Sequence, residues 1–94
     1  MFSLNKPLAW SDEKNEVLIK ERGIGFEQVR EKIINGDIVD VIDHPNQKDY
    51  SHQKILLINF DDYIYAVPYV EDKQHIFLKT IFPTRKLTKQ KLKR

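Results

Sequence analysis

Two stretches with a helical period come first along the chain, and stretches with the period of β-strands follow. Residues 12–22 predict a first helix of about 11 residues, capped by Ser11 or the aspartate after it and ended by Gly23. A second helix is predicted from Phe26 until Gly36, because its apolar residues recur at spacings of three and four. The connection is short, so we expect the two helices to form a hairpin or to pack at an angle on a common sheet.

After Gly36 the apolar positions alternate with a period of two, which is typical of strands. Three strands are predicted before the last one, at residues 38–42, 54–60 and 63–70. Asp61 and Asp62 predict a tight turn between the second and the third. Pro68 argues for an interruption or an edge position in the third strand, because proline has no N–H to donate.

The last predicted strand begins near Gln74 and stops at Pro83. Side chains alternate between the two faces of a strand, so Lys79 is predicted to project from a sheet face. One face would carry Ile76, Leu78, Thr80 and Phe82, and the other Phe77, Lys79 and Ile81. The strand end places Arg85 and Lys86 beside a tail rich in cations, which we interpret as part of a binding site for a polyanion.

These elements predict an α+β fold, with two N-terminal helices packed on an antiparallel meander of about four strands and a basic C-terminal segment. Residues 1–94 are short enough for a single domain. Residues 1–10 are predicted to form an N-terminal arm or a short edge strand. Residues 84–94 either form a short helix with Leu87 and Leu92 docked or stay disordered until a partner binds.

The net charge of +2 hides a strong asymmetry along the chain. From Lys79 onward there are seven cations and no acid, which gives +7. The 78 residues before it hold nine cations and all 14 acids, which gives −5. A basic edge on an acidic body is typical of nucleic-acid binding, and the alternative is a merely solvated tail.

Several classes of site are disfavoured by composition. The chain has no cysteine, so disulfides, thiolate catalysis and cysteine-ligated zinc are excluded. His44, His52 and His75 form no metal-binding pattern, and no cofactor is expected. No signal peptide and no apolar segment of membrane-spanning length is recognised, so we expect a cytoplasmic protein without a membrane partner.

The opening W-S-D-E-K followed by G-I-G-F-E, and the closing I-F-P-T-R-K-L-T, carry a family resemblance. From about residue 10 to residue 88 the chain resembles BrnT-type toxins of bacterial type II toxin-antitoxin systems, small members of the RelE-like ribonuclease group. The matching positions are Trp10, Lys14, Gly23, Phe26, Glu27, Ile81, Arg85, Lys86 and Thr88.

The chain also departs from the family pattern. Glu21 and Arg22 stand where the family has Lys-His, Leu18 stands at the position of an asparagine, and Pro83 or Thr84 at that of a serine. A divergent or inactive member is therefore an open alternative.

The resemblance implies an endoribonuclease that cleaves RNA without a metal, by attack of the 2′-hydroxyl on the adjacent phosphate, and that is neutralised by a cognate antitoxin. Arg85 is the best candidate to hold the phosphate, because its planar fork donates two hydrogen bonds. Lys79 is the second cation, Lys14 carries a family match, and Glu27 is a candidate base. The structural alternative is a solvated cation for Arg85, a stem that covers the sheet face for Lys79, and a helix-capping carboxylate for Glu27.

Further residues are candidates to bind the RNA. Lys20 and Arg22 are chosen for charge alone, with a solvated face as the alternative, and Lys86 also carries a family match. Trp10 either stacks on a base or anchors the first helix in the core.

Two other functional classes stay open. A non-catalytic module would hold nucleic acid with the basic tail and the tyrosines of the third strand, unless these are half-buried under the helices. Those tyrosines are Tyr63, Tyr65 and Tyr69. A protein-binding module would accept a strand of its partner at an exposed sheet edge.

Overall fold

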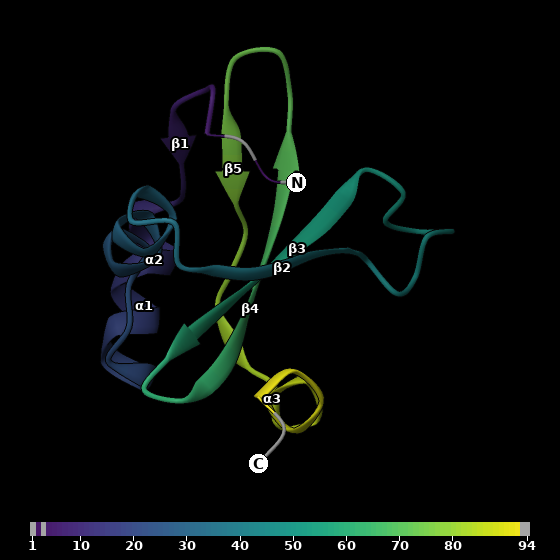
Figure 1. Cartoon of the computed structure of the whole chain (residues 1–94). Helices are drawn as coiled ribbons and strands as arrows, with labels where there is room; N and C mark the ends of the chain where they lie inside the picture. The colour runs from purple at the N-terminus through teal and green to yellow at the C-terminus, as the bar shows by residue number, and fades with distance from the viewer. Residues whose placement is uncertain (1, 3, 93–94) are drawn as a thin grey trace.

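The computed structural model describes residues 2 and 4–92 and has an α+β fold with three helices and a six-stranded sheet (Figure 1). The helices are α1 (Asp12–Arg22), α2 (Phe26–Ile34) and α3 (Arg85–Leu92). The strands are β1 (Leu8–Ala9), β2 (Ile38–Asp43), β3 (Gln53–Phe60), β4 (Tyr63–Glu71), β5 (Ile76–Leu78) and β6 (Phe82–Pro83). Both predicted N-terminal helices and the first three predicted strands are confirmed.

The sheet is mixed, with the order β1-β5-β4-β3-β2 and with β6 paired to β4. The expectation of about four antiparallel strands was wrong in two respects. Residues 8 and 9 form a short edge strand, one of the two alternatives predicted for residues 1–10, but this strand is parallel to β5 and was not among the four. The Ile76 N–H supports the pair by donating to the Pro7 carbonyl oxygen at 3.0 Å. The predicted last strand is two strands, β5 and β6, which both pair with β4.

Pro68 accounts for the break between β5 and β6. It lies in the central strand β4, so the edge position was wrong. The strand β4 itself runs without interruption from Tyr63 to Glu71, and the break falls in its neighbour, between β5 and β6. Its carbonyl oxygen accepts the Lys79 N–H at 2.8 Å, so its backbone faces the side of β4 on which β5 and β6 pair. Because a residue's N–H and C=O point to the same side of a strand, the donor missing at Pro68 interrupts the ladder there.

The break also changes which residues of this segment are buried. The alternation predicted Ile81 on the face opposite Ile76 and Leu78, and this was wrong, because all three belong to one core cluster. Phe82, predicted on the face of Ile76, is 37% exposed and lies opposite Ala66. A period of two holds only while the backbone stays extended, and residues 79–81 lie between the two strands.

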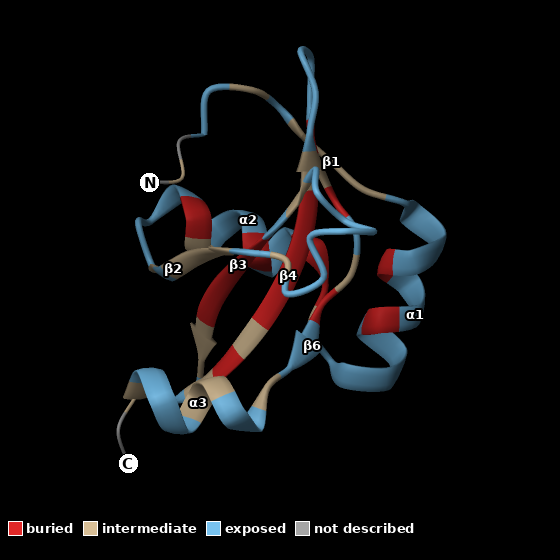
Figure 2. Ribbon diagram, turned by 90° about the vertical axis from the view of Figure 1, so that its right-hand side faces the viewer, coloured by how far each residue is buried: buried red, intermediate tan, exposed pale blue. Residues whose placement is uncertain are grey.

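Two apolar clusters hold the layers together, and Figure 2 marks the buried residues of the chain in red. The larger cluster joins α1 and α2 to one face of the sheet and is built on Leu18, Phe26, Val29, Ile33, Leu56, Ile58, Val67, Tyr69, Ile76, Leu78 and Ile81. The smaller one lies under α3 on the other face and is built on Ile55, Leu57, Ile64 and Ala66. The short helix α3 therefore covers part of a face that the other helices leave open.

The ends of the elements agree with the sequence chemistry. The Ser11 hydroxyl accepts the Lys14 N–H at 3.2 Å, and Gly23 has a φ of 72° after the end of α1. Asp61 and Asp62 have φ values of 54° and 64°, as a tight hairpin turn between β3 and β4 requires. These predicted caps and this turn are confirmed.

The C-terminal segment is helical and docked over Arg85–Leu92, as one of the two predicted alternatives stated, and residues 93 and 94 lie outside the described residues. Leu87 and Leu92 pack against the smaller cluster. Thr88 fixes the register of α3, because its hydroxyl accepts the Ile64 N–H at 2.8 Å and donates to the Thr84 carbonyl at 2.7 Å. Lys91 adds an ion pair with Asp40 at 2.7 Å.

Replacing Thr88 with valine is expected to destabilise the protein by about 1–2 kcal/mol, because the Ile64 N–H then lacks its acceptor. Chemical denaturation measures the change. Thr88→Ser keeps the hydroxyl and is the matched control, which should lose clearly less. A Thr88→Val protein as stable as the wild type would contradict the contribution of this hydrogen bond.

Candidate nucleic-acid interface

The first turn of α3 carries cations where a helix favours acids. Arg85 and Lys86 are its first two residues, both are exposed, and the turn contains no acid. Cations at the positive end of a helix dipole cost about 0.3–1 kcal/mol each at low ionic strength. Within residues 2 and 4–92, neither cation has an ion pair. This turn is thus an exposed, uncompensated positive site next to the end of β6.

Backbone donors add to this charge. The first N–H groups of a helix have no partner inside the helix. No described side chain accepts a hydrogen bond from Arg85, Lys86 or Leu87 N–H. Helix N-termini of this kind bind anions such as phosphate.

Lys79 is exposed and lies between β5 and β6, whereas it was predicted inside a strand, projecting from a sheet face. Its ammonium group is 5.5 Å from the centre of the Phe77 ring, so the stem lies along an aromatic side chain. Its backbone N–H is fixed by Pro68. The lysine is therefore held on a constrained segment with its charge free for an anion.

The cations of α1 lie on the other layer of the molecule. Lys14, Lys20 and Arg22 are all exposed, and none has an ion pair in the part of the chain that the structure describes. The carboxyl end of α1 and the helix α3 lie at the same lower end of the molecule in both views (Figures 1 and 2). Lys20 and Arg22 belong to that last turn of α1, whereas Lys14 belongs to its beginning.

Trp10 is part of the core packing. Its ring stacks on Phe26 with centroids 5.6 Å apart, and it packs against the larger cluster. This contact is the anchor role that was one of its two predicted alternatives. The tyrosines of β4 also face the α1 and α2 layer, since Tyr69 is 5% exposed and Tyr65 packs against the same cluster. The half-buried alternative for these two tyrosines is confirmed.

Glu27 is engaged at the joint between α1 and α2. The Asn15 amide donates to its two carboxylate oxygens at 2.9 and 3.1 Å. This hydrogen bond, followed by one from its own backbone N–H, lowers the pKa of Glu27. The Asn15 carbonyl oxygen accepts the Phe26 N–H at 2.7 Å. The carboxylate therefore acts as a structural acceptor that stays ionised at neutral pH.

Asn15 was not singled out in the sequence, although it is 7% exposed and is the buried polar residue of the described core. The family resemblance expects an asparagine at the position of Leu18, which is 2% exposed. Asn15 lies three residues earlier, on the same side of the helix. A polar residue on the apolar stripe beside Leu18 was the signal that could have identified it.

Gly25 completes this joint, because a Cβ there would lie 2.8 Å from the Asn15 carbonyl oxygen and 2.9 Å from an Ile19 carbon. Gly25→Ala is expected to cost about 1–3 kcal/mol, because the asparagine is held by its own hydrogen bonds and cannot yield freely. Thermal unfolding measures the loss. Gly36→Ala measures a different cost, because φ is 76° there and no atom is close, so it reports left-handed backbone strain that Gly25, with a φ of −113°, does not have. A Gly25→Ala protein as stable as wild type would contradict the close packing.

The sequence-predicted residues thus fall into two groups. Lys79, Arg85 and Lys86 lie along β5, β6 and the start of α3, whereas Trp10, Lys14 and Glu27 lie in the α1 and α2 layer. In this second group, Trp10 is packed against Phe26 and Glu27 is hydrogen-bonded to Asn15. The first group is the candidate interface for a polyanion.

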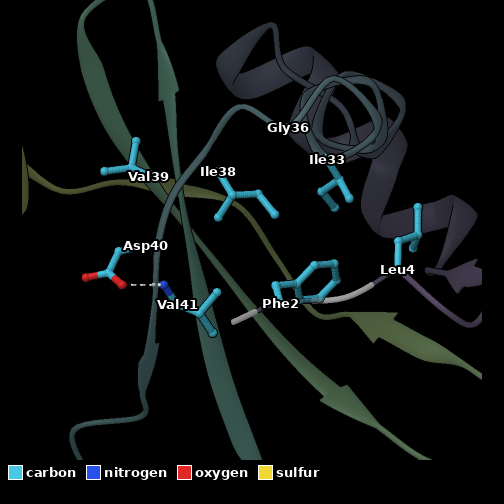
Figure 3. A pocket seen from close by; sticks show the side chains of 8 residues that line it. All are labelled: Phe2, Leu4, Ile33, Gly36, Ile38, Val39, Asp40 and Val41. Carbon is cyan, nitrogen blue, oxygen red and sulfur yellow. Dashed lines mark hydrogen bonds between the residues drawn. The ribbon is translucent and has the colours of Figure 1, made fainter.

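A pocket of about 500 Å³ lies elsewhere, between α2, the N-terminal segment and β2 (Figure 3). Its apolar lining includes Phe2, Ile33 and Ile38. Asp40 at its rim accepts the Val41 N–H at 2.8 Å, and the Lys91 hydrogen bond is the main cause of the lowered pKa of Asp40. With apolar walls and an occupied carboxylate, this pocket does not suit a phosphate.

The remaining histidines and acids form no further site. His44 stacks on Tyr50 with centroids 4.3 Å apart, inside the loop between β2 and β3. Over residues 2 and 4–92, no group of three acids or histidines is placed to hold a metal. The same residues contain no helix long and apolar enough to cross a membrane.

Comparison with models of known protein families, with curated proteins and with solved structures found no match. The resemblance in the opening and closing motifs therefore stays a prediction.

Proposed function

We propose that this protein binds RNA at the start of α3 and cleaves it as a metal-independent endoribonuclease, the toxin of a type II toxin-antitoxin pair with a RelE-like fold. The observation that carries the proposal is the pair Arg85 and Lys86 in the first turn of α3, exposed and without ion pairs. This arrangement opposes the helix dipole, and a bound phosphate would compensate it.

The chemistry requires charge stabilisation more than any other contribution. When the 2′-oxygen attacks, its bond to phosphorus forms, the bond from phosphorus to the 5′-oxygen breaks, and negative charge gathers on the other phosphoryl oxygens. Arg85 would donate two hydrogen bonds to these oxygens, and Lys79 would add a second charge. The products are a 2′,3′-cyclic phosphate and a free 5′-hydroxyl.

The bacterial antitoxin that the resemblance implies would act by covering the same cations. An acidic segment lying across Arg85 and Lys86 would neutralise them and exclude RNA. The proposal therefore assigns inhibitor and substrate to one surface.

A non-catalytic nucleic-acid-binding module is the second candidate. It is favoured by the state of Glu27, whose carboxylate is bound by Asn15 in the other layer. Residues 79–92 contain no acid and no histidine, so proton transfer there would fall to lysine or water.

One experiment separates the two candidates. Purified protein is incubated with a structured RNA in excess EDTA, and the product ends are mapped. Cleavage that survives chelation and leaves cyclic phosphate ends is expected for the ribonuclease. RNA that stays intact, with binding that weakens steeply as salt rises, would select the binding module instead.

A further inference from the structure

A row of aromatic and cationic side chains runs beside α3 on the face that this helix only partly covers. Phe77 lies opposite Val70, and Phe82 lies opposite Ala66. Residues opposite each other in an antiparallel pair point to the same face, and Val70 and Ala66 are an even number of residues apart. Ala66 belongs to the cluster that Leu87 and Leu92 of α3 pack against, so both rings belong to the face on which α3 lies.

The two rings are accessible. Neither phenylalanine belongs to the cluster under α3, which Leu87 and Leu92 cover. Phe82 is 37% exposed and Phe77 is half-buried. Their partners are four residues apart on β4, so the backbone positions of the two phenylalanines are about 13 Å apart along the strand direction.

Positive charge lies between and beyond the rings. Lys79 is positioned over Phe77 at 5.5 Å, and Arg85 follows Phe82 by three residues at the start of α3. The acids on the turn between β4 and β5 are already engaged: Glu71 pairs with Lys6 at 2.6 Å, and Asp72 accepts the Gln74 and His75 N–H groups. The row is thus aromatic and cationic, and the carboxylates of Glu71 and Asp72 are held by other partners.

We propose that an unpaired stretch of RNA lies along this row, with bases stacked on Phe77 and Phe82 and phosphates bound by Lys79 and Arg85. The inference rests on the proposed function and adds that its substrate is single-stranded at the site. Stacking on aromatic rings is open to bases that have left a helix, whereas the bases of a duplex already stack on each other. Charge alone would not make this distinction.

The test uses a fluorescent single-stranded oligonucleotide with 2′-O-methyl groups, which cannot be cleaved, and measures binding by anisotropy at several salt concentrations. Phe82→Leu is expected to weaken binding about 5- to 100-fold, because it removes the stacking surface and keeps an apolar side chain. Its salt dependence should stay that of the wild type. Lys79→Ala should weaken binding and also lower the salt slope by about 1.

Two controls keep the test sharp. Tyr50→Leu removes an exposed aromatic ring from a distant loop and should bind like the wild type. Phe77→Tyr retains a ring and should also bind normally, while Phe77→Leu should not. A duplex of the same sequence should bind more weakly than the single strand and be insensitive to Phe82→Leu.

The proposed binding of single-stranded RNA along this row is wrong if Phe82→Leu and Phe77→Leu bind the single strand like the wild type. It is equally wrong if the wild type does not bind the single strand. It is also overturned if the duplex binds as well as the single strand. The cleavage assay in EDTA is independent of these results. If the wild type cleaves RNA but the phenylalanine variants bind the single strand normally, the proposed stacking is wrong and the proposed ribonuclease activity is still supported.

Discussion

Arg85→Ala is expected to lower the rate of RNA cleavage about 10²- to 10³-fold, the usual loss when one donor to a developing oxyanion is removed. The residue is exposed at the start of α3, so its replacement should leave the fold and its thermal stability nearly unchanged. Single-turnover cleavage in EDTA, with product ends mapped, gives the rate. Loss of rate with retained stability is the expected pattern.

Two matched variants sharpen this result. Arg85→Lys keeps the charge and loses the planar fork, so an intermediate rate is expected. Arg30→Ala removes an exposed arginine from α2 in the other layer and should cleave like the wild type. Full activity of Arg85→Ala would remove this residue from the site, and equal losses in Arg85→Ala and Arg30→Ala would reduce the effect to net charge.

Asn15→Ala is expected to destabilise the protein by about 2–4 kcal/mol, the largest loss among the polar substitutions considered. The change leaves the buried Phe26 N–H without its acceptor and removes a side chain from the core. For a domain of this size, each kcal/mol lowers the melting temperature by about 4–8 °C. Chemical and thermal unfolding give the two values. A loss well below this range would contradict the contribution of the Asn15 side chain.

The same substitution changes the response to acid. The Asn15 hydrogen bond lowers the pKa of Glu27 in the folded state, so its contribution to stability is present above the unfolded pKa and is lost as the pH falls through the folded value. Stability of the wild type should therefore decline below about pH 4, the ordinary range of a glutamate. Asn15→Ala should decline less over that range, and Glu27→Gln should show the same flattening. An unchanged acid slope in both would contradict this linkage.

Local signals predicted most of the elements. Ser11, Gly23 and the Asp61-Asp62 turn each determine the backbone through their own side chain or φ preference, so their positions could be read without the rest of the fold. The docked α3 followed from two leucines at a helical spacing. Such features depend on residues that are neighbours in the sequence, so the sequence alone is enough to predict them.

What could not be predicted depends on contacts distant in sequence. The parallel pair of β1 and β5 joins residues 8 and 76, and two residues carry no periodicity of their own. The division of the last strand depends on Pro68 in the neighbouring strand, as the Lys79 hydrogen bond shows. The role of Asn15 depends on Phe26 and Glu27 in another helix. The charge pattern was enough to name Lys79 and the cations of α3 as site residues. It could not show that Glu27 lies in another layer, separated from them.

The break in the ladder opposite Pro68 leaves residues 82–92 as a segment with few attachments of its own to the sheet. Residues 82–92 are joined to the sheet by the two paired residues of β6 and by the packing of α3. Two hydrogen bonds also join them to Ile64, one to its N–H and one to its carbonyl oxygen. An isolated helix of eight residues is not stable in water, so α3 depends on this docking. The segment should open without global unfolding, with amide exchange at a lower free energy than in β3 and β4. Any ligand of Arg85 would then also stabilise the segment that carries it, which makes binding and local folding a single equilibrium.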